Sequence, residues 1–344
     1  MIRWLDARIA ELAPRHFALV MATGIVSIAA WLEGLEGLAR VLLGFNLLAY
    51  GVLVALTIAR AARHRARLVA DALDHRRAPD FFTLVAGTGV LGTQLLTIRS
   101  DPTLPWILWI TAAVLWVAIT YGFFTVVTIK QDKPPIETGL SGSWLLVVVA
   151  TQSLAVLGPL LAQGQEPGRE RDAILLTCLS LFFVGCLLYG VLITLILYRF
   201  IFFPFTSVQL APPYWINMGA VAITTVAASS LLGAAALSPL LAELVPVLRG
   251  LAIAFWATAS WWIPLLVLLG IWRHGHGRVR ITYDPQYWGL VFPLGMYTTA
   301  TVRLSHALEL PFLLVISRGF VFVAIAAWTL TLLGLGRALL RTRA

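Results

Sequence analysis

Long apolar segments recur along the whole chain and leave little polar sequence between them. Ten segments are long enough to cross a bilayer, which takes about 20 mostly apolar residues. They lie at 17–33, 38–59, 81–98, 104–129, 142–163, 173–198, 214–236, 247–272, 286–305 and 310–336. Because a helix satisfies every backbone polar group within its own segment, this pattern predicts an all-α polytopic membrane protein, with one transmembrane domain over residues 1–344.

The composition agrees with this class and disfavours others. Hydrophobic residues make up 60% of the chain and charged residues 12%, whereas soluble domains carry roughly 25% charged residues. The net charge of +9 is explained by arginines in loops, so no nucleic-acid partner is expected. The two cysteines, Cys178 and Cys186, are too few for a disulfide framework or a metal cluster, and we predict neither a metal nor a cofactor.

The basic residues are shared unevenly between the two sides of the predicted membrane. Eighteen of the 25 Lys and Arg residues, from Arg3 to Arg343, fall in the terminal segments and in the loops that follow even-numbered spans. Cytoplasmic loops carry the excess of Lys and Arg, so both termini are expected in the cytoplasm. The first 16 residues lack the apolar core of a signal peptide. The expected location is a cell membrane, with a bacterial inner membrane favoured.

The odd-numbered spans resemble one another. Each begins with an aromatic residue, and each has a small residue seven positions later. The aromatic residues are Phe17, Phe82, Trp144, Trp215 and Trp288, and the small ones are Gly24, Gly89, Thr151, Ala222 and Gly295. The spacings of 65, 62, 71 and 73 residues predict one helical hairpin used five times. The odd spans are expected to form an inner ring, with the bulkier even spans outside.

Two interpretations of the small and polar residues in the odd spans are open. Small residues let membrane helices approach closely and hydroxyls bond across helices, which makes these residues packing faces. Alternatively they line a central pore, where hydroxyls and amides donate hydrogen bonds to an anion without holding it tightly. The candidate lining residues are Thr23, Gly24, Ser27, Gly89, Thr93, Thr151, Ser153, Asn217, Gly219, Thr224, Gly295 and Thr298.

The ninth span places a phenylalanine beside a proline at mid-depth. Pro293 has no amide hydrogen, so the helix is expected to bend or open there and to face protein or a water-filled cavity. The residues four positions after the initial aromatics are Met21, Ala86, Val148, Gly219 and Phe292. Phe292 is the one aromatic in this layer, so Phe292 and Pro293 are the candidate gate of a narrow pore. Packing against a neighbouring helix is the alternative for Phe292.

Charged residues are expected mainly outside the membrane interior. No Asp, Glu or Lys lies well inside a predicted span, which argues against a carboxylate proton relay and against a cation pathway. Arg303 and Arg318 lie toward the outer ends of their spans, where they either form a positive vestibule for anions or extend to the interface. The DALDHRR run at 71–77 is expected to be solvated loop charge.

Four segments together are similar to one known family. They are HFALVMATGIVSIA (16–29), YWINMGAVAIT (214–224), WATASWWIPLLV (256–267) and YWGLVFPLGMYTTATVRL (287–304). The chain resembles the tellurite-resistance/dicarboxylate transporter family, which includes slow-type anion channels, malate permeases and sulfite efflux proteins. The resemblance covers all ten spans. It implies five helical hairpins with quasi-fivefold symmetry around a central pore, a homotrimer, and a gating phenylalanine on the ninth span, which Phe292 matches.

The residues and the resemblance together predict an anion channel or permease. Its pore, occluded by Phe292, would pass small inorganic or organic anions such as chloride, nitrate, malate or sulfite. The alternative is a secondary carrier for malate-type dicarboxylates or sulfite, with or without a co-moving proton. An enzyme is not expected, because a membrane enzyme needs acid, base or metal ligands clustered at one membrane face, and the spans offer none.

Overall fold

The computed structural model describes residues 2–341, in which the chain is helical and forms no β-strand. Arg343 and the side chain of Arg3, counted above among the basic residues, lie outside the described part. A helix occupies each of the ten predicted ranges. These helices are α2 (Ala18–Leu32), α3 (Glu36–Arg63), α5 (Phe82–Arg99), α6 (Thr103–Ile129), α8 (Leu146–Ala162), α9 (Arg169–Phe202), α10 (Ile216–Gly233), α12 (Val245–Ile271), α13 (Trp288–Leu308) and α14 (Leu314–Arg341).

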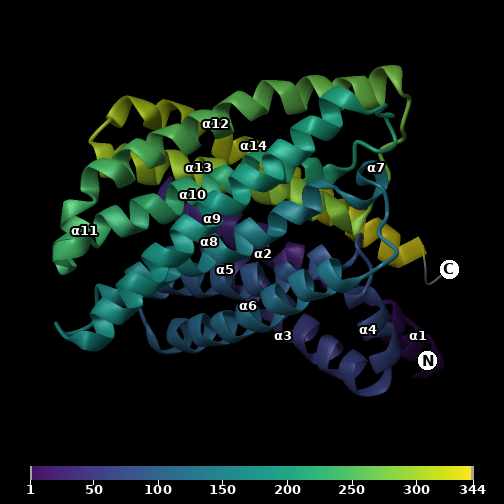
Figure 1. The fold of residues 1–344 in the computed structure, drawn as a ribbon, viewed down its shortest axis with the longest axis horizontal. Helices are drawn as coiled ribbons and strands as arrows, with labels where there is room; N and C mark the ends of the chain where they lie inside the picture. The colour runs from purple at the N-terminus through teal and green to yellow at the C-terminus, as the bar shows by residue number, and fades with distance from the viewer. Residues whose placement is uncertain (1, 342–344) are drawn as a thin grey trace.

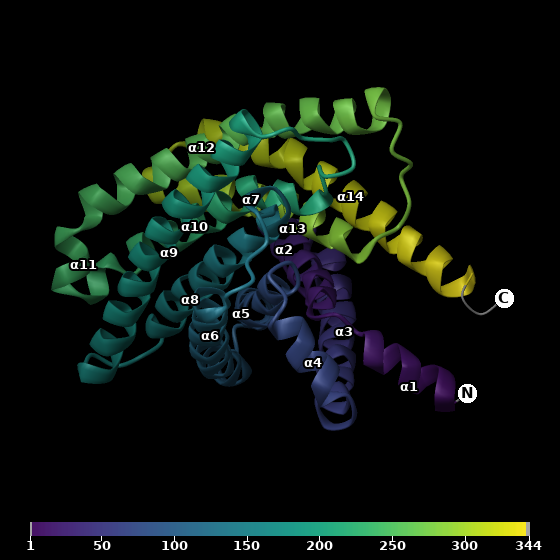
Figure 2. The same cartoon turned by 45° about the vertical axis from the view of Figure 1, so that its right-hand side comes forward.

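Four short helices that the apolar pattern did not predict lie between or before the long ones. They are α1 (Ile2–Glu11), α4 (Arg65–Ala72), α7 (Ile136–Gly139) and α11 (Pro239–Glu243). Both termini lie at one end of the molecule, and α11 lies at the opposite end (Figures 1 and 2). An even number of passages between the two ends accounts for this arrangement.

Nine of the described helices are long and apolar enough to cross a membrane, so the protein is a multi-pass membrane protein. The helix α13 is not among the nine. It carries Pro293, several hydroxyl residues and Arg303, and it contacts α2, α10 and α14. Because protein surrounds most of this helix, its side chains do not have to be as apolar as those that face lipid.

The long helices form two layers. The helices α2, α5, α8, α10 and α13, called the ring helices below, contact one another in a closed cycle. The helices α3, α6, α9, α12 and α14, called the cover helices, lie outside them (Figure 2). Burial separates the layers, since the apolar windows are 72–94% buried in α2, α5, α8 and α10 but only 17–39% buried in the cover helices.

Hydrogen bonds fasten each ring helix to a cover helix, which is the one that precedes it in the chain for α5, α8, α10 and α13, and the last helix, α14, for α2. Trp328 of α14 donates to the Thr23 hydroxyl of α2 at 2.9 Å, and Trp116 of α6 donates to the Thr151 hydroxyl of α8 at 2.8 Å. The same relation is made by Tyr50 with Thr88, Tyr189 with the carbonyl oxygen of Asn217, and Trp256 with Thr301. Indole and phenol groups thus find polar partners inside an apolar layer.

A short 3₁₀ turn precedes each ring helix, and the five turns also contact one another in a cycle. They are Pro14–Phe17, Ala78–Phe81, Gly142–Leu145, Pro212–Trp215 and Pro285–Tyr287. The Thr83 hydroxyl ties the first two turns together, because it lies 2.7 Å from the Pro14 carbonyl oxygen and 2.6 Å from the Asp80 carbonyl oxygen. The turns close one end of the ring, which we call the amino end.

Asp71, the first of the two acidic residues in the DALDHRR run, is not solvated, so that prediction was wrong for Asp71. Its side chain is 7% exposed and contacts Arg60 at 2.6 Å and Arg77 at 2.7 Å. Burial acts to raise the pKa of Asp71, but the hydrogen bonds from Arg60 and Arg77 outweigh it and leave the pKa below its usual value. The Arg60–Asp71 pair holds α4 against the end of α3.

Candidate functional site

Two cavities lie inside the ring, one toward each end of the ring helices. The amino-end cavity is lined by Arg15, Ala18, Met21, Asp80, Thr83, Ser143, Leu146, Pro213, Ile216, Pro285, Gln286, Gly289 and Phe292. The carboxyl-end cavity is lined by Ile25, Ile28, Val90, Thr93, Ser153, Val156, Leu160, Ile223, Val226, Ser230, Met296, Thr299 and Arg303.

The cavity walls repeat at constant sequence intervals. The layer Arg15, Asp80, Ser143, Pro213 and Gln286 lines the mouth of the amino-end cavity, and every deeper layer keeps the same intervals of 65, 63, 70 and 73 residues. Two such layers in the carboxyl-end cavity are Ile25, Val90, Ser153, Ile223 and Met296, followed by Ile28, Thr93, Val156, Val226 and Thr299. Each of these layers therefore takes one residue from each ring helix or from the 3₁₀ turn that precedes it.

The repeat predicted from the sequence was out of register by one residue in α8. Trp144 was aligned with Phe17, but the indole of Trp144 donates to the Gly139 carbonyl oxygen and packs against Phe123 of a cover helix. The residue of α8 that lines the amino-end cavity at the level of Ala18 is Leu146. The same intervals therefore place Val149, rather than Val148, level with Phe292.

One layer of side chains separates the two cavities. Phe292 and Met21 form the deepest wall of the amino-end cavity, and Met296 and Ile25 begin the wall of the carboxyl-end cavity. Four residues along a helix span roughly 6 Å, about the thickness of one ring of side chains. The Phe292 side chain is 1% exposed and is one of the residues that line the amino-end cavity.

The helix α13 continues through Pro293 without opening, contrary to one of the two outcomes expected from the sequence. The proline ring packs against Gly219 of α10, where a Cβ would lie only 2.7 Å from the Pro293 Cγ. The carbonyl oxygen of Gly289, one turn earlier, has no amide hydrogen to accept from Pro293. Gly289 lines the amino-end cavity, so the missing backbone bond lies beside open space.

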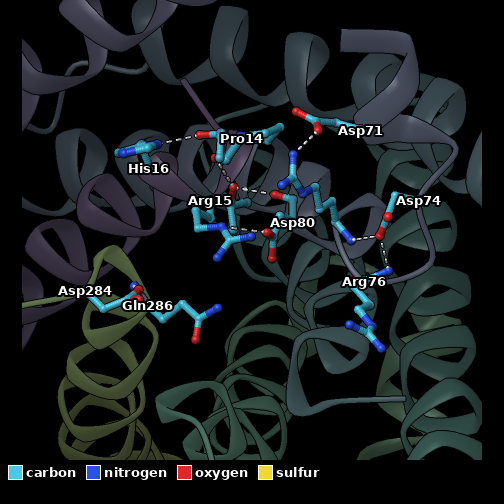
Figure 3. A network of polar contacts seen from close by, with 12 residues as sticks. Pro14, Arg15, His16, Asp71, Asp74, Arg76, Asp80, Asp284 and Gln286 are labelled. Carbon is cyan, nitrogen blue, oxygen red and sulfur yellow. Dashed lines mark hydrogen bonds and ion pairs between the residues drawn. The ribbon is translucent and has the colours of Figure 1, made fainter. Parts of the chain in front are cut away.

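An ion pair stands at the mouth of the amino-end cavity. The Arg15 Nε atom lies 2.9 Å from an Asp80 carboxylate oxygen, and the side chains are 25% and 7% exposed. Figure 3 shows the two groups pointing toward each other. Asp284 and Gln286, at the turn that precedes α13, lie together on one side of Arg15. The sequence prediction placed no carboxylate within the spans, and Asp80 was missed because the predicted span began at residue 81.

The carboxyl-end cavity has an apolar wall with a few unpaired polar groups. The buried Thr299 hydroxyl has no hydrogen-bond partner. Arg303 lies on the same wall, half-buried, and no carboxylate among the described residues pairs with it. Thr93 and Ser153 add two hydroxyls, although each donates to a carbonyl of its own helix. The cavity therefore offers one positive charge and hydrogen-bond donors, with no negative group.

Of the twelve candidate lining residues, Thr93 and Ser153 lie on a cavity wall and the other ten do not. Thr23 and Thr151 accept hydrogen bonds from cover helices, and Ser27 donates to the Ala39 carbonyl oxygen of α3. Gly24, Gly89, Gly219 and Gly295 lie at contacts with adjacent helices. Asn217, Thr224 and Thr298 are fully buried away from both cavities. For these residues the packing interpretation describes their contacts.

The two candidate vestibule arginines occupy different places. Arg303 lines the carboxyl-end cavity, whereas Arg318 is exposed on the outer helix α14 and lines neither cavity. The wall residues missed from the sequence include Arg15, Asp80 and Thr299. A usable signal existed, because Arg15 and Asp80 are 65 residues apart, the same interval as Phe17 and Phe82.

The fold and the paired cavities define a membrane transport protein. Residues 11–335 match the family described as voltage-dependent anion channel (SLAC1), so the chain belongs to this family. An uncharacterized transporter of Methanocaldococcus jannaschii is 24% identical over 327 residues, which cover 92% of each chain. A second transporter of that organism is 23% identical over 335 residues, 94% of this chain and 92% of its own.

A shorter relative occurs in Mycobacterium tuberculosis. This uncharacterized membrane protein is 38% identical over 144 residues, which are 42% of this chain and 73% of the relative. The resemblance to the tellurite-resistance/dicarboxylate and slow-type anion channel families that the sequence motifs indicated is thus confirmed.

Proposed function

We propose that the protein moves small anions along the axis of the ring helices, between the amino-end and carboxyl-end cavities. The observation that supports this proposal is the alignment of two cavities on one axis with a single layer of side chains between them. All ten long helices cross the membrane in this proposal, and the five hairpins are related by quasi-fivefold symmetry. The constant intervals between wall residues support this symmetry.

Phe292 is the occluding group in the proposed pathway. Its ring fills the layer between the cavities, and the equivalent positions of the other ring helices carry smaller side chains, with glycine at 219. A narrow apolar constriction excludes water and so blocks ions. Pro293 fixes the local backbone through its contact with Gly219, so the phenylalanine is held by a proline beside it.

The charges on the cavity walls favour anions. Arg303 is unpaired, Arg15 has a single carboxylate partner, and Asp80 is the one carboxylate among the wall residues of either cavity. Chloride, nitrate, sulfite and malate-type anions all remain candidates. An unpaired cation in a low-dielectric cavity attracts any of them, while cations are repelled.

The proposed orientation places the amino end and both termini in the cytoplasm of a cell membrane. Its support is the positive charge at this end, where Arg76, Lys130 and Lys133 hydrogen-bond to nearby loop and helix-end carbonyl groups. A homotrimer is proposed from the family resemblance. The apolar outer faces of the cover helices would face lipid and neighbouring copies.

The decisive test is anion flux through purified protein in liposomes, with wild type and Phe292→Ala compared in chloride, nitrate, sulfite and malate. We expect Phe292→Ala to raise the flux of at least one of these anions, because the cavities join. Phe82→Ala is the matched control, since Phe82 is equally buried but packs outward against Phe123 of α6. Equal fluxes for folded Phe292→Ala and wild type would show that the gate assignment is wrong.

A secondary carrier is the second candidate, favoured by the closure of the two cavities from each other. A carrier opens to one side at a time, and its turnover stays near enzymatic rates of up to about 10³ per second. Single-channel current steps, or fluxes far above that turnover, would support the channel and exclude the carrier.

A further inference from the structure

The ion pair of Arg15 and Asp80 is built into the wall of the proposed pathway. The two residues occupy the same position in consecutive repeats, and both line the mouth of the amino-end cavity. Asp80 is 5% exposed, and the contact at 2.9 Å is its one ion pair among the described residues. A buried carboxylate without a counter-ion is strongly disfavoured, so the charged form of Asp80 depends on Arg15.

Arg15 has more hydrogen-bonding capacity than Asp80 uses. The 2.9 Å ion contact is made by Nε, whose N–H forms no hydrogen bond, and the two terminal amino groups of the guanidinium have no partner in the described part of the chain. These amino groups are not fully buried, and Arg15 forms part of the cavity wall. A guanidinium with free terminal groups binds planar oxyanions through two parallel hydrogen bonds.

The other charged groups near the pair are already neutralised or lie on other turns. Asp71 of α4 is held by Arg60 and Arg77, as described above. The remaining groups near the same end are Asp284, whose carboxylate accepts from the Gln286 amide, and His16, whose ring bonds to the Ala13 carbonyl oxygen. The cavity wall itself contributes one cation and one carboxylate, Arg15 and Asp80.

We propose that Asp80 is a tethered counter-ion that competes with anions for Arg15, and that anion binding in the amino-end cavity is coupled to protonation of Asp80. An anion on Arg15 removes the counter-ion of a buried carboxylate, which then takes one proton from water at the amino end. Conversely, protonation of Asp80 leaves the Arg15 charge free for an anion. Protonation of Asp80 therefore raises the anion affinity of Arg15 by the same factor by which anion binding raises the proton affinity of Asp80.

The coupling deepens the proposed function, because it assigns an anion site to the proposed pathway, but its binding step does not depend on permeation. Anion affinity is expected to rise as pH falls, since protonated Asp80 no longer competes. We expect anion affinity to rise at least about tenfold between about pH 8 and about pH 5, as Asp80 takes up a proton and frees Arg15. Asp80→Asn carries no charge to compete and should bind anions tightly at every pH.

The experiment uses nitrate as the probe, because nitrate binds no proton in this range and any pH dependence belongs to the protein. Stabilisation of the purified full chain by sodium nitrate, against sodium gluconate at equal ionic strength, reports binding from thermal unfolding. Nitrate flux into liposomes reports transport. Both are measured at several pH values for wild type, Asp80→Asn and Asp71→Asn. Asp71→Asn is the matched control, because Asp71 is equally buried and arginine-paired but lines neither cavity.

The inference is supported if nitrate binding strengthens at low pH in wild type and Asp71→Asn but is strong and independent of pH in Asp80→Asn. The same pH dependence in wild type and Asp80→Asn overturns it, as does weaker binding by folded Asp80→Asn at every pH. Arg15→Gln should lose nitrate binding at all pH values, and retained binding also overturns the inference. Binding that follows this pattern without any flux would refute the transport proposal alone, and flux without this pattern would refute the coupling alone.

Discussion

The contact between Gly219 and Pro293 gives the sharpest quantitative prediction, because it lies beside the proposed gate. A Cβ at position 219 would lie 2.7 Å from the Pro293 Cγ, 3.1 Å from its Cβ and 3.3 Å from its Cα. Ordinary contact begins at 3.4 Å, so Gly219→Ala requires the helices to separate by roughly 0.7 Å. The proline ring is bonded to the backbone at both ends and cannot rotate away.

The cost follows from two opposing effects. Overpacking at a rigid contact costs about 1–3 kcal/mol, while alanine in place of glycine within a helix returns about 1 kcal/mol. Gly233→Ala in the same helix α10 is the matched control, since its new Cβ would meet only the Gln163 Nε2 atom at 3.6 Å. Gly233→Ala gains the same helix stabilisation without the clash, so the free energies of unfolding of the two variants should differ by the overpacking cost alone.

The assay is thermal unfolding of both variants in detergent, combined with nitrate flux in liposomes. The stability difference corresponds to a melting temperature about 2–6 °C lower for Gly219→Ala than for Gly233→Ala, at about 2 °C per kcal/mol. Flux should rise in Gly219→Ala, because α13 shifts at the residue next to Phe292. Equal melting temperatures would refute the rigid contact, and a lower melting temperature with unchanged flux would refute its link to the gate.

Two further predictions concern the cover helices and the carboxyl-end cavity. Thr151→Val removes the acceptor of the Trp116 indole and should cost about 0.6–2 kcal/mol of stability without changing anion flux. Thr151→Ser keeps the hydroxyl and should retain the wild-type stability. A change of flux in Thr151→Val would contradict the placement of Thr151 outside the pathway. Arg303→Gln removes the charge on the carboxyl-end cavity wall and should lower anion flux several-fold at low salt. Arg318→Gln, on the outer surface, should leave flux at the wild-type level. The reverse order would show that Arg303 does not attract anions into the pathway.

The two-layer arrangement explains why hydroxyl residues recur in the ring helices. The Thr23, Thr88 and Thr151 hydroxyls accept from, or share a hydrogen with, Trp328, Tyr50 and Trp116 on the cover helices. The three threonines keep the intervals of the cavity-wall layers, yet they point away from the axis. A repeated polar residue in a membrane helix therefore marks a repeated helix contact as readily as a pore.

Much of the architecture could be predicted from the sequence because apolar length and repeat spacing are one-dimensional properties. The ten helices begin and end within a few residues of the predicted ranges, and four of the five repeats were aligned in the register of the cavity walls. The α8 repeat was misaligned by one residue because its aromatic residue, Trp144, comes one position before Leu145, which is the residue equivalent to Phe17. A one-residue shift rotates a helix by about 100°, which changes the face that is assigned to the axis.

The sequence by itself determined the membrane class and the positions of the long helices, and it predicted the hairpin repeat and Phe292 as the one aromatic of its layer. Only the tertiary structure decided which side chains face the axis, that Asp80 is buried against Arg15, and that Arg303 rather than Arg318 lines a cavity. The physical reason is that the ring helices contact protein on nearly every side. Such helices have no polar face in their sequence to mark the axis, so contacts between distant segments of the chain decide which side chains face it.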